Sequence, residues 1–116
     1  MEEKNQSKLN VLWTSCDRQV ALDMVFMYCL NSRLKGWWQE VSLIVWGPSA
    51  ELLNRDEELK KELAKLRQAG VEILACRACA DRYGVSRELE DLGIKVIYMG
   101  QPLTHLLKED AKLLTV

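Results

Sequence analysis

Short apolar runs alternate with segments of helical length and composition along all 116 residues, and this alternation constrains the fold more than any other feature. Each apolar run is rich in Val, Ile and Leu and is bounded by polar residues or glycine, which is typical of buried strands. The predicted strands span 8–15, 40–46, 71–75, 94–99 and 112–116. The predicted helical segments span 17–33, 54–70, 77–92 and 102–109.

This order predicts an α/β fold with a mostly parallel sheet, helices on both faces and right-handed crossovers. We expect one domain over 8–116, preceded by a flexible lead-in at 1–7. In such sheets, ligands and chemistry gather at the carboxyl ends of the strands. The loops of interest are therefore 14–18, 46–53, 75–79 and 99–105.

Helix boundaries follow from capping residues. Asn54, with Glu57 three residues later, resembles a capping box, and Gly70 marks the end of that helix. We interpret 49–53 as a separate turn before it. The segment 77–92 is predicted to break near Gly84 into two short helices, with Ser86 as the cap of the second.

The charge balance argues against a nucleic-acid or anionic-membrane binder. The chain has 16 Lys and Arg against 17 Asp and Glu, a net charge of −1, whereas such binders usually carry a basic excess. No apolar stretch approaches the ~20 residues of a membrane helix, and the polar, acidic start is unlike a signal peptide. We therefore expect a cytoplasmic protein whose four cysteines are thiols.

Cysteines lie in two of the loops at the carboxyl edge. Cys16 follows the first predicted strand, and Cys76 follows the third and opens a helix. A thiol at a helix N-terminus meets free N–H groups and the positive end of the helix dipole, which favour the thiolate. Arg77 and Arg82 would add to this effect if their side chains turn toward the sulfur.

Three chemistries compete for the pair Cys76 and Cys79. One is thioredoxin-like disulfide exchange, although neither Trp nor Gly precedes the pair and no Pro lies within it. A zinc site would need Cys16 or His105 to complete its ligands. The third is sulfur transfer, with a persulfide carried on Cys76. A non-catalytic module that binds a small ligand or a partner is the alternative from a different class.

No cofactor is predicted, because neither of the common phosphate-binding glycine motifs occurs. We expect no metal either. His105 is the only histidine; it could act as an acid or base, but an exposed or structurally satisfied side chain is the simpler interpretation. Tyr83 and Trp46 are interpreted as wall or core residues.

Three stretches resemble the DsrE/DsrF-like family, and their order and spacing carry the resemblance over nearly the whole chain. They are GVEILACRACADRYGV at 70–85, VWGPSAELL at 45–53, and LGIKV at 92–96 followed by Met99-Gly100. The chain departs from some relatives in having Cys79, and in having Trp46 where they often carry a polar residue.

The resemblance implies a three-layer α/β/α domain with a five-stranded parallel sheet, and homo-oligomers that are commonly trimers or hexamers. Some members of the family, related to sulfur-relay proteins, carry sulfur on the cysteine that matches Cys76. A sulfur carrier or sulfurtransferase-like protein is therefore the predicted function, with a protein sulfur donor or acceptor as possible partner.

In the family the second strand lies between the first and third, which bears on the site. Cys16 and Cys76 would then start about 10 Å apart, or two strand spacings, too far for a direct disulfide. Both could line one substrate pocket, with Gly47 and Pro48 as its floor and Arg77 beside it. Cys79 is the nearer resolving thiol for Cys76. We expect Cys29, in mid-helix, only to pack.

The first helical segment predicts self-association. Between 20 and 30 only Asp23 is polar, so apolar side chains surround the helix. A helix that covers one face of a sheet should be polar on its other side. We therefore expect a second subunit to cover the remaining surface, with Trp37 and Trp38 extending the patch.

Overall fold

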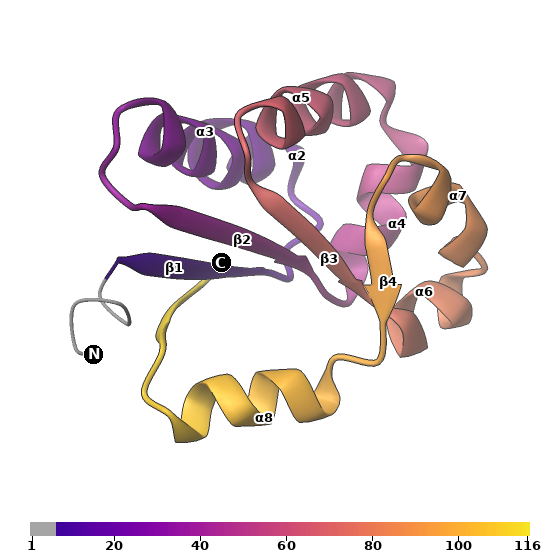
Figure 1. Cartoon of the computed structure of the whole chain (residues 1–116). Helices are drawn as coiled ribbons and strands as arrows, with labels where there is room; N and C mark the ends of the chain where they lie inside the picture. Colours follow the sequence, from indigo (N-terminus) through magenta and orange to yellow (C-terminus); the bar gives the residue numbers. More distant parts are fainter. Residues whose placement is uncertain (1–6) are drawn as a thin grey trace.

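The computed structural model describes residues 7–116, so most of the predicted lead-in lies outside the described residues. Five parallel strands form one sheet in the order β4-β3-β2-β1-β5 (Figure 1), which confirms the predicted fold class. The strands are β1 (Lys8–Trp13), β2 (Glu40–Val45), β3 (Glu72–Cys76), β4 (Lys95–Ile97) and β5 (Lys112–Thr115). Ser7, predicted as lead-in, already accepts hydrogen bonds from the backbone N–H groups of Gln39 and Glu40.

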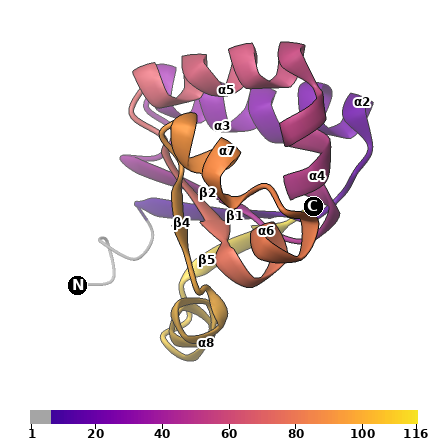
Figure 2. The ribbon, with the colours of Figure 1, turned by 90° about the vertical axis from the view of Figure 1, so that its right-hand side faces the viewer.

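Helices cover the two faces of the sheet unequally (Figures 1 and 2). The first helical segment and α5 (Glu57–Gln68) lie over one face, and α8 (Gly100–Lys108) lies alone over the other. The first segment runs as α2 (Arg18–Val20), η1 (Ala21–Phe26) and α3 (Met27–Leu34). Near β4 and the carboxyl ends of β2 and β3 lie α4 (Pro48–Arg55), α6 (Arg77–Tyr83) and α7 (Ser86–Asp91).

Two separate hydrophobic clusters result. The larger packs the first helical segment and α5 against the sheet, and it includes Trp13 and Phe26, whose rings meet edge to face at 5.1 Å. The smaller lies on the α8 face and is centred on Ile44, Cys76 and Met99. Because strand side chains alternate between faces, Cys76 belongs to the thinly covered side of the sheet.

The sheet face that α8 covers changes from polar to apolar along the strands. Near their amino ends it carries polar residues, among them Asn10, Ser42 and Glu72, with the Ser42 hydroxyl 3.1 Å from a carboxylate oxygen of Glu72. Near their carboxyl ends it is apolar. The residues there are Leu12, Ile44, Leu74, Cys76 and Ile97. Leu106 of α8 packs against this apolar half.

Two helix starts differ from the prediction. The predicted turn at 49–53 is part of α4, and Asn54 lies inside that helix. Asp56 caps α5 instead: its extended backbone separates the two helices, and its carboxylate accepts a hydrogen bond from the Leu59 N–H. Ser86 does not cap α7, because its hydroxyl bonds to the Asp81 carboxylate. Gly70, with φ of +97°, follows the end of α5 as predicted.

The first helical segment contains one turn of π-helix, η1, that the sequence pattern did not indicate. Asp17 caps the start of the segment, at α2, by accepting hydrogen bonds from the Gln19 and Val20 N–H groups. Opposite the buried face, a row of exposed apolar residues runs along the helix and into the following loop. We call this row the methionine face; it comprises Met24, Met27, Leu34 and Trp37.

Strand β5 brings residues from the far end of the sequence against β1. The Val116 N–H donates to the Leu12 carbonyl oxygen at 2.8 Å, and the Thr14 N–H donates to the Val116 carbonyl oxygen at 2.7 Å. Strand β1 is thereby paired on both sides, by β2 and β5. Within residues 7–116, no helix is long and apolar enough to cross a membrane.

Candidate functional site

Cys76 is the last residue of β3 and the N-cap of α6, as its place in the sequence predicted. Its backbone is extended, with φ of −70° and ψ of 115°, and it makes no side-chain capping bond. The side chain is only 4% exposed and packs in the smaller cluster with Ile44 and Met99. A reagent therefore reaches this sulfur only through an opening at the carboxyl edge.

Cys79 lies one turn further along α6, half-buried, and its thiol is hydrogen-bonded to Cys76. Burial raises the pKa of the Cys79 thiol above its usual value, and the bond to Cys76 and the negative charge that Cys76 can carry raise it further. The Gly47 N–H donates to the Cys79 sulfur and, with the positive charge of Arg82, opposes that rise in pKa. On balance these contacts raise the pKa of Cys79 and so disfavour its thiolate.

The loop after β2 positions that Gly47 N–H. Gly47 has φ of 72° and ψ of −140°, a backbone conformation that only glycine adopts without strain. Pro48 then opens α4 as its first residue, where a missing N–H costs nothing. Gly47 thus contributes to the cysteine site through its backbone.

Arg77 does not turn toward the cysteine pair. Its guanidinium donates to the Val96 carbonyl oxygen at 2.8 Å and forms an ion pair with Glu90 at 3.1 Å. These contacts tie the start of α6 to β4 and α7. Arg82, the other arginine that the sequence analysis named, is the one whose positive charge acts on Cys79.

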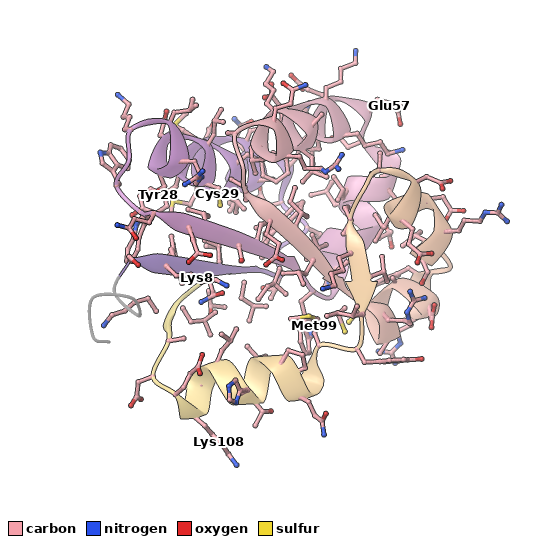
Figure 3. All side chains as sticks on the ribbon, in the orientation of Figure 1. Lys8, Tyr28, Cys29, Glu57, Met99 and Lys108 are labelled. Atoms are coloured by element: carbon pink, nitrogen blue, oxygen red, sulfur yellow. The ribbon has the colours of Figure 1, made fainter. Side chains whose placement is uncertain are left out.

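A pocket of about 410 Å³ opens beside Cys76 at the carboxyl edge, between β4 and the start of α8. Figure 3 shows Met99 at this junction. The residues that line the pocket are Trp46, Cys76, Ala78, Tyr98, Met99, Gly100 and Gln101. Trp46 is half-buried, as a wall residue should be, while Tyr98 is 68% exposed.

The structure does not bring every predicted site residue to this pocket. Cys16 is exposed in the loop after β1 and is not part of the lining, and neither are Pro48 and Arg77. Tyr98 and Gln101 line the pocket but were not predicted as site residues. The sequence analysis placed Tyr98 inside the predicted strand 94–99, whereas β4 ends at Ile97, so Tyr98 lies in the loop at the edge where ligands gather.

The other titratable candidates lie elsewhere. Cys29 is buried in the larger cluster, where burial raises its thiol pKa from 9.0 to about 12, consistent with a packing role. His105 is exposed on α8, with its Nε2 3.1 Å from a carboxylate oxygen of Glu109. Among residues 7–116, no three His, Cys, Asp or Glu side chains are grouped so as to hold a metal ion.

The sequence profile of the DsrE/DsrF-like family matches residues 13–116, which includes the whole site. The chain belongs to the DsrE/DsrF-like family. No match was found among curated proteins.

Solved structures agree with this membership. A conserved protein of unknown function from Bacteroides thetaiotaomicron is 38% identical to this DsrE-like protein, with a TM-score of 0.95 and 97% of each chain covered. A protein of unknown function from Methanobacterium thermoautotrophicum is 17% identical, with a TM-score of 0.71 over 94% of this chain and 98% of the other. The ychN protein from E. coli is 15% identical, with a TM-score of 0.75 over 95% and 99%. The last two establish the fold alone.

Proposed function

We propose that this DsrE-like protein is a sulfur carrier that holds sulfane sulfur as a persulfide on Cys76. The observation that carries the proposal is the position of Cys76: it ends a parallel strand at the carboxyl edge, opens a helix and lines a pocket. Family membership supports a role related to sulfur relay. The cytoplasm, where thiols stay reduced, is the compartment that suits this chemistry.

The transfer step is a thiolate–sulfur exchange. The Cys76 thiolate attacks the outer sulfur of a donor persulfide R–S–SH, a new S–S bond forms on Cys76, and the donor's S–S bond breaks to release R–S⁻. The proton stays on the transferred sulfur, so charge and atoms balance. The Cys79 thiol keeps its own proton and donates a hydrogen bond to the attacking sulfur. In this proposal the donor and the acceptor are other proteins or small thiols.

Intact-protein mass spectrometry after incubation with a persulfidated cysteine desulfurase or another sulfane donor tests this function. We expect the mass of one added sulfur, mapped to Cys76, that is lost in Cys76→Ser and kept in Cys79→Ser. Trypsin cleaves after Arg77, so the two cysteines fall in separate peptides and the site is read directly. Equal labelling of both variants, or none in the unmodified protein with several donors, would contradict the proposal.

The hydrogen bond between Cys76 and Cys79 favours a second candidate function, thiol–disulfide exchange. A Cys-x-x-Cys pair at the start of a helix is the arrangement that such proteins use. A variant without Cys79 distinguishes the two functions, because disulfide exchange needs both thiols, whereas carriage of a persulfide needs only Cys76. A non-catalytic binding module would show neither activity in these assays.

We also propose that the protein forms homo-oligomers, with the trimer or hexamer that the family resemblance implies. The methionine face supports this, because Met27 is 52% exposed, Leu34 66% and Trp37 56%, and a second copy would cover them. Light scattering at micromolar concentration should give a mass above that of one chain. Met27→Glu should lower it, and Lys61→Glu on exposed α5 is the matched control. A monomer at this concentration would overturn the proposal.

A further inference from the structure

The lining of the pocket beside Cys76 contains no charged side chain. Besides Cys76, it is formed by Trp46, Tyr98, Met99, Ala78 and the uncharged first residues of α8. The nearest basic residue in sequence, Arg77, is held by Val96 and Glu90, and Arg82 is not part of the lining. An anionic ligand in this pocket would therefore meet no side-chain countercharge, only the backbone N–H groups of Gly100 and Gln101 at the start of α8.

The burial of Cys76 also restricts which compounds can react with its sulfur. Because Cys76 is only 4% exposed, a sulfur atom that reacts with it must enter the pocket on a small group and leave its water behind. Removing water from an ionised group costs far more than removing it from an apolar one. Aromatic rings and a thioether favour contact with apolar and sulfur-containing groups. The pocket, at about 410 Å³, is within the size range of small-molecule sites.

We propose that this pocket binds organic sulfur compounds with an apolar substituent, in the uncharged, protonated form R–S–SH, and disfavours small inorganic anions such as thiosulfate. The proposal rests on the proposed function only for the fate of the sulfur. In the reacting complex, R lies between Trp46 and Tyr98 while the outer sulfur of R–S–SH faces Cys76. The Cys76 thiolate takes that sulfur, the S–S bond of the donor breaks, and R–S⁻ leaves.

Alkylation measures the selectivity of the pocket without any sulfur transfer. Iodoacetanilide is neutral and aromatic, iodoacetamide neutral and small, and iodoacetate anionic. Exposed Cys16 is the internal reference, and tryptic peptides report it separately from Cys76. We expect the ratio of Cys76 to Cys16 labelling to fall in the order anilide, amide, acetate, by about tenfold from first to last. Equal ratios for the three reagents would overturn the proposal.

Substitutions in the lining test which residues produce the selectivity. Trp46→Ala and Tyr98→Ala should each remove most of the anilide preference, whereas Trp37→Ala, on the methionine face, should leave it unchanged. Gln101 is exposed, so Gln101→Lys should fold normally and raise the iodoacetate ratio several-fold by adding a countercharge to the lining. An unchanged iodoacetate ratio in Gln101→Lys would count against the pocket as the route to Cys76.

Sulfur donors then separate this proposal from the proposed function. If the alkylation ratios follow the expected order but no donor persulfidates Cys76, the pocket assignment stands and the sulfur-carrier function fails. If Cys76 accepts sulfur equally from thiosulfate and from an aryl persulfide, and the three alkylation ratios are equal, the carrier function stands and the pocket assignment fails. Faster persulfidation by the aryl donor, lost in Tyr98→Ala, supports both.

Discussion

The Ser49 hydroxyl donates a hydrogen bond to the backbone carbonyl oxygen of Trp13, with 2.6 Å between the two oxygen atoms. The same hydroxyl accepts a hydrogen bond from the Trp46 N–H at 3.2 Å, and it is fully buried. One side chain therefore joins the ends of β1 and β2 to the start of α4. Gly47, whose N–H donates to the Cys79 sulfur, lies between these fixed points.

Ser49→Ala should lower the free energy of unfolding by about 0.5–1.5 kcal/mol, because it removes buried hydrogen bonds while the Trp46 N–H and the Trp13 carbonyl stay bonded to each other. Urea unfolding measures the change. Ser86→Ala is the control, since the Ser86 hydroxyl bonds to Asp81 in an exposed position and its loss should cost less. Equal losses in the two variants would show that the Ser49 bonds contribute little.

Gly47→Ala should lower the free energy of unfolding by about 1–3 kcal/mol through backbone strain alone, since an added Cβ would meet no atom within 4 Å. Gly84 is a matched control: its φ is also positive, at 68°, and its Cβ would also be unobstructed, but its ψ of 32° lies in the left-handed region that other residues can enter. Gly84→Ala should cost less, about 1–2 kcal/mol. Thermal unfolding of both variants checks the order.

Stability should fall in alkali because of Cys29. Its thiol pKa is raised to about 12 in the folded protein from an ordinary value of 9.0. Between these pH values the unfolded chain releases the thiol proton and the folded chain keeps it, so raising the pH favours unfolding, by up to about 1.4 kcal/mol per pH unit. Below pH 9 the contribution is constant.

Chemical denaturation of the unmodified protein and of Cys29→Ala, each from pH 8 to 11, measures this dependence. The alanine variant should be less stable at pH 8, because it leaves a cavity, but its stability should decline less steeply with pH. Parallel curves for the two proteins would mean that Cys29 does not titrate as its burial requires.

Oxidation with diamide should produce a disulfide between Cys76 and Cys79, because their side chains are already in hydrogen-bond contact. The mass should fall by two hydrogens, and Cys76 should become inert to iodoacetamide. Neither Cys76→Ser nor Cys79→Ser should form this bond, whereas Cys29→Ala should form it normally. A disulfide that involves Cys16 instead would contradict the arrangement of the thiols.

Residue pattern alone was sufficient for the parallel sheet and for the place of Cys76 in it. Runs such as 40–46 have the length and β-branched content of buried strands. The end of such an apolar run locates the end of the strand to within about a residue or two. The order with β2 between β1 and β3 came from the family resemblance, and the structure confirms it. That order separates Cys16 from Cys76 by a strand.

Side-chain direction and helix capping were harder to predict from the sequence. Asn54 and Asp56 are both good capping residues two positions apart, and the choice depends on which backbone is extended, which sequence spacing does not show. Arg77 follows Cys76 directly, yet its guanidinium is drawn away by a carbonyl of β4, a contact that exists only after the sheet has formed. Tyr98 and Gln101 likewise come together with Cys76 only once β4 has paired with β3 and α8 has packed on the sheet.

The pairing of β5 with β1 also has a consequence for synthesis on the ribosome. Strand β1 is made about a hundred residues before one of its two hydrogen-bonded neighbours, Lys112–Thr115. Until then one edge of β1 is open, and an unpaired edge strand readily joins strands of other chains. Nascent chains of this protein should therefore depend on chaperones that shield strand edges, and chains shortened before residue 112 should aggregate.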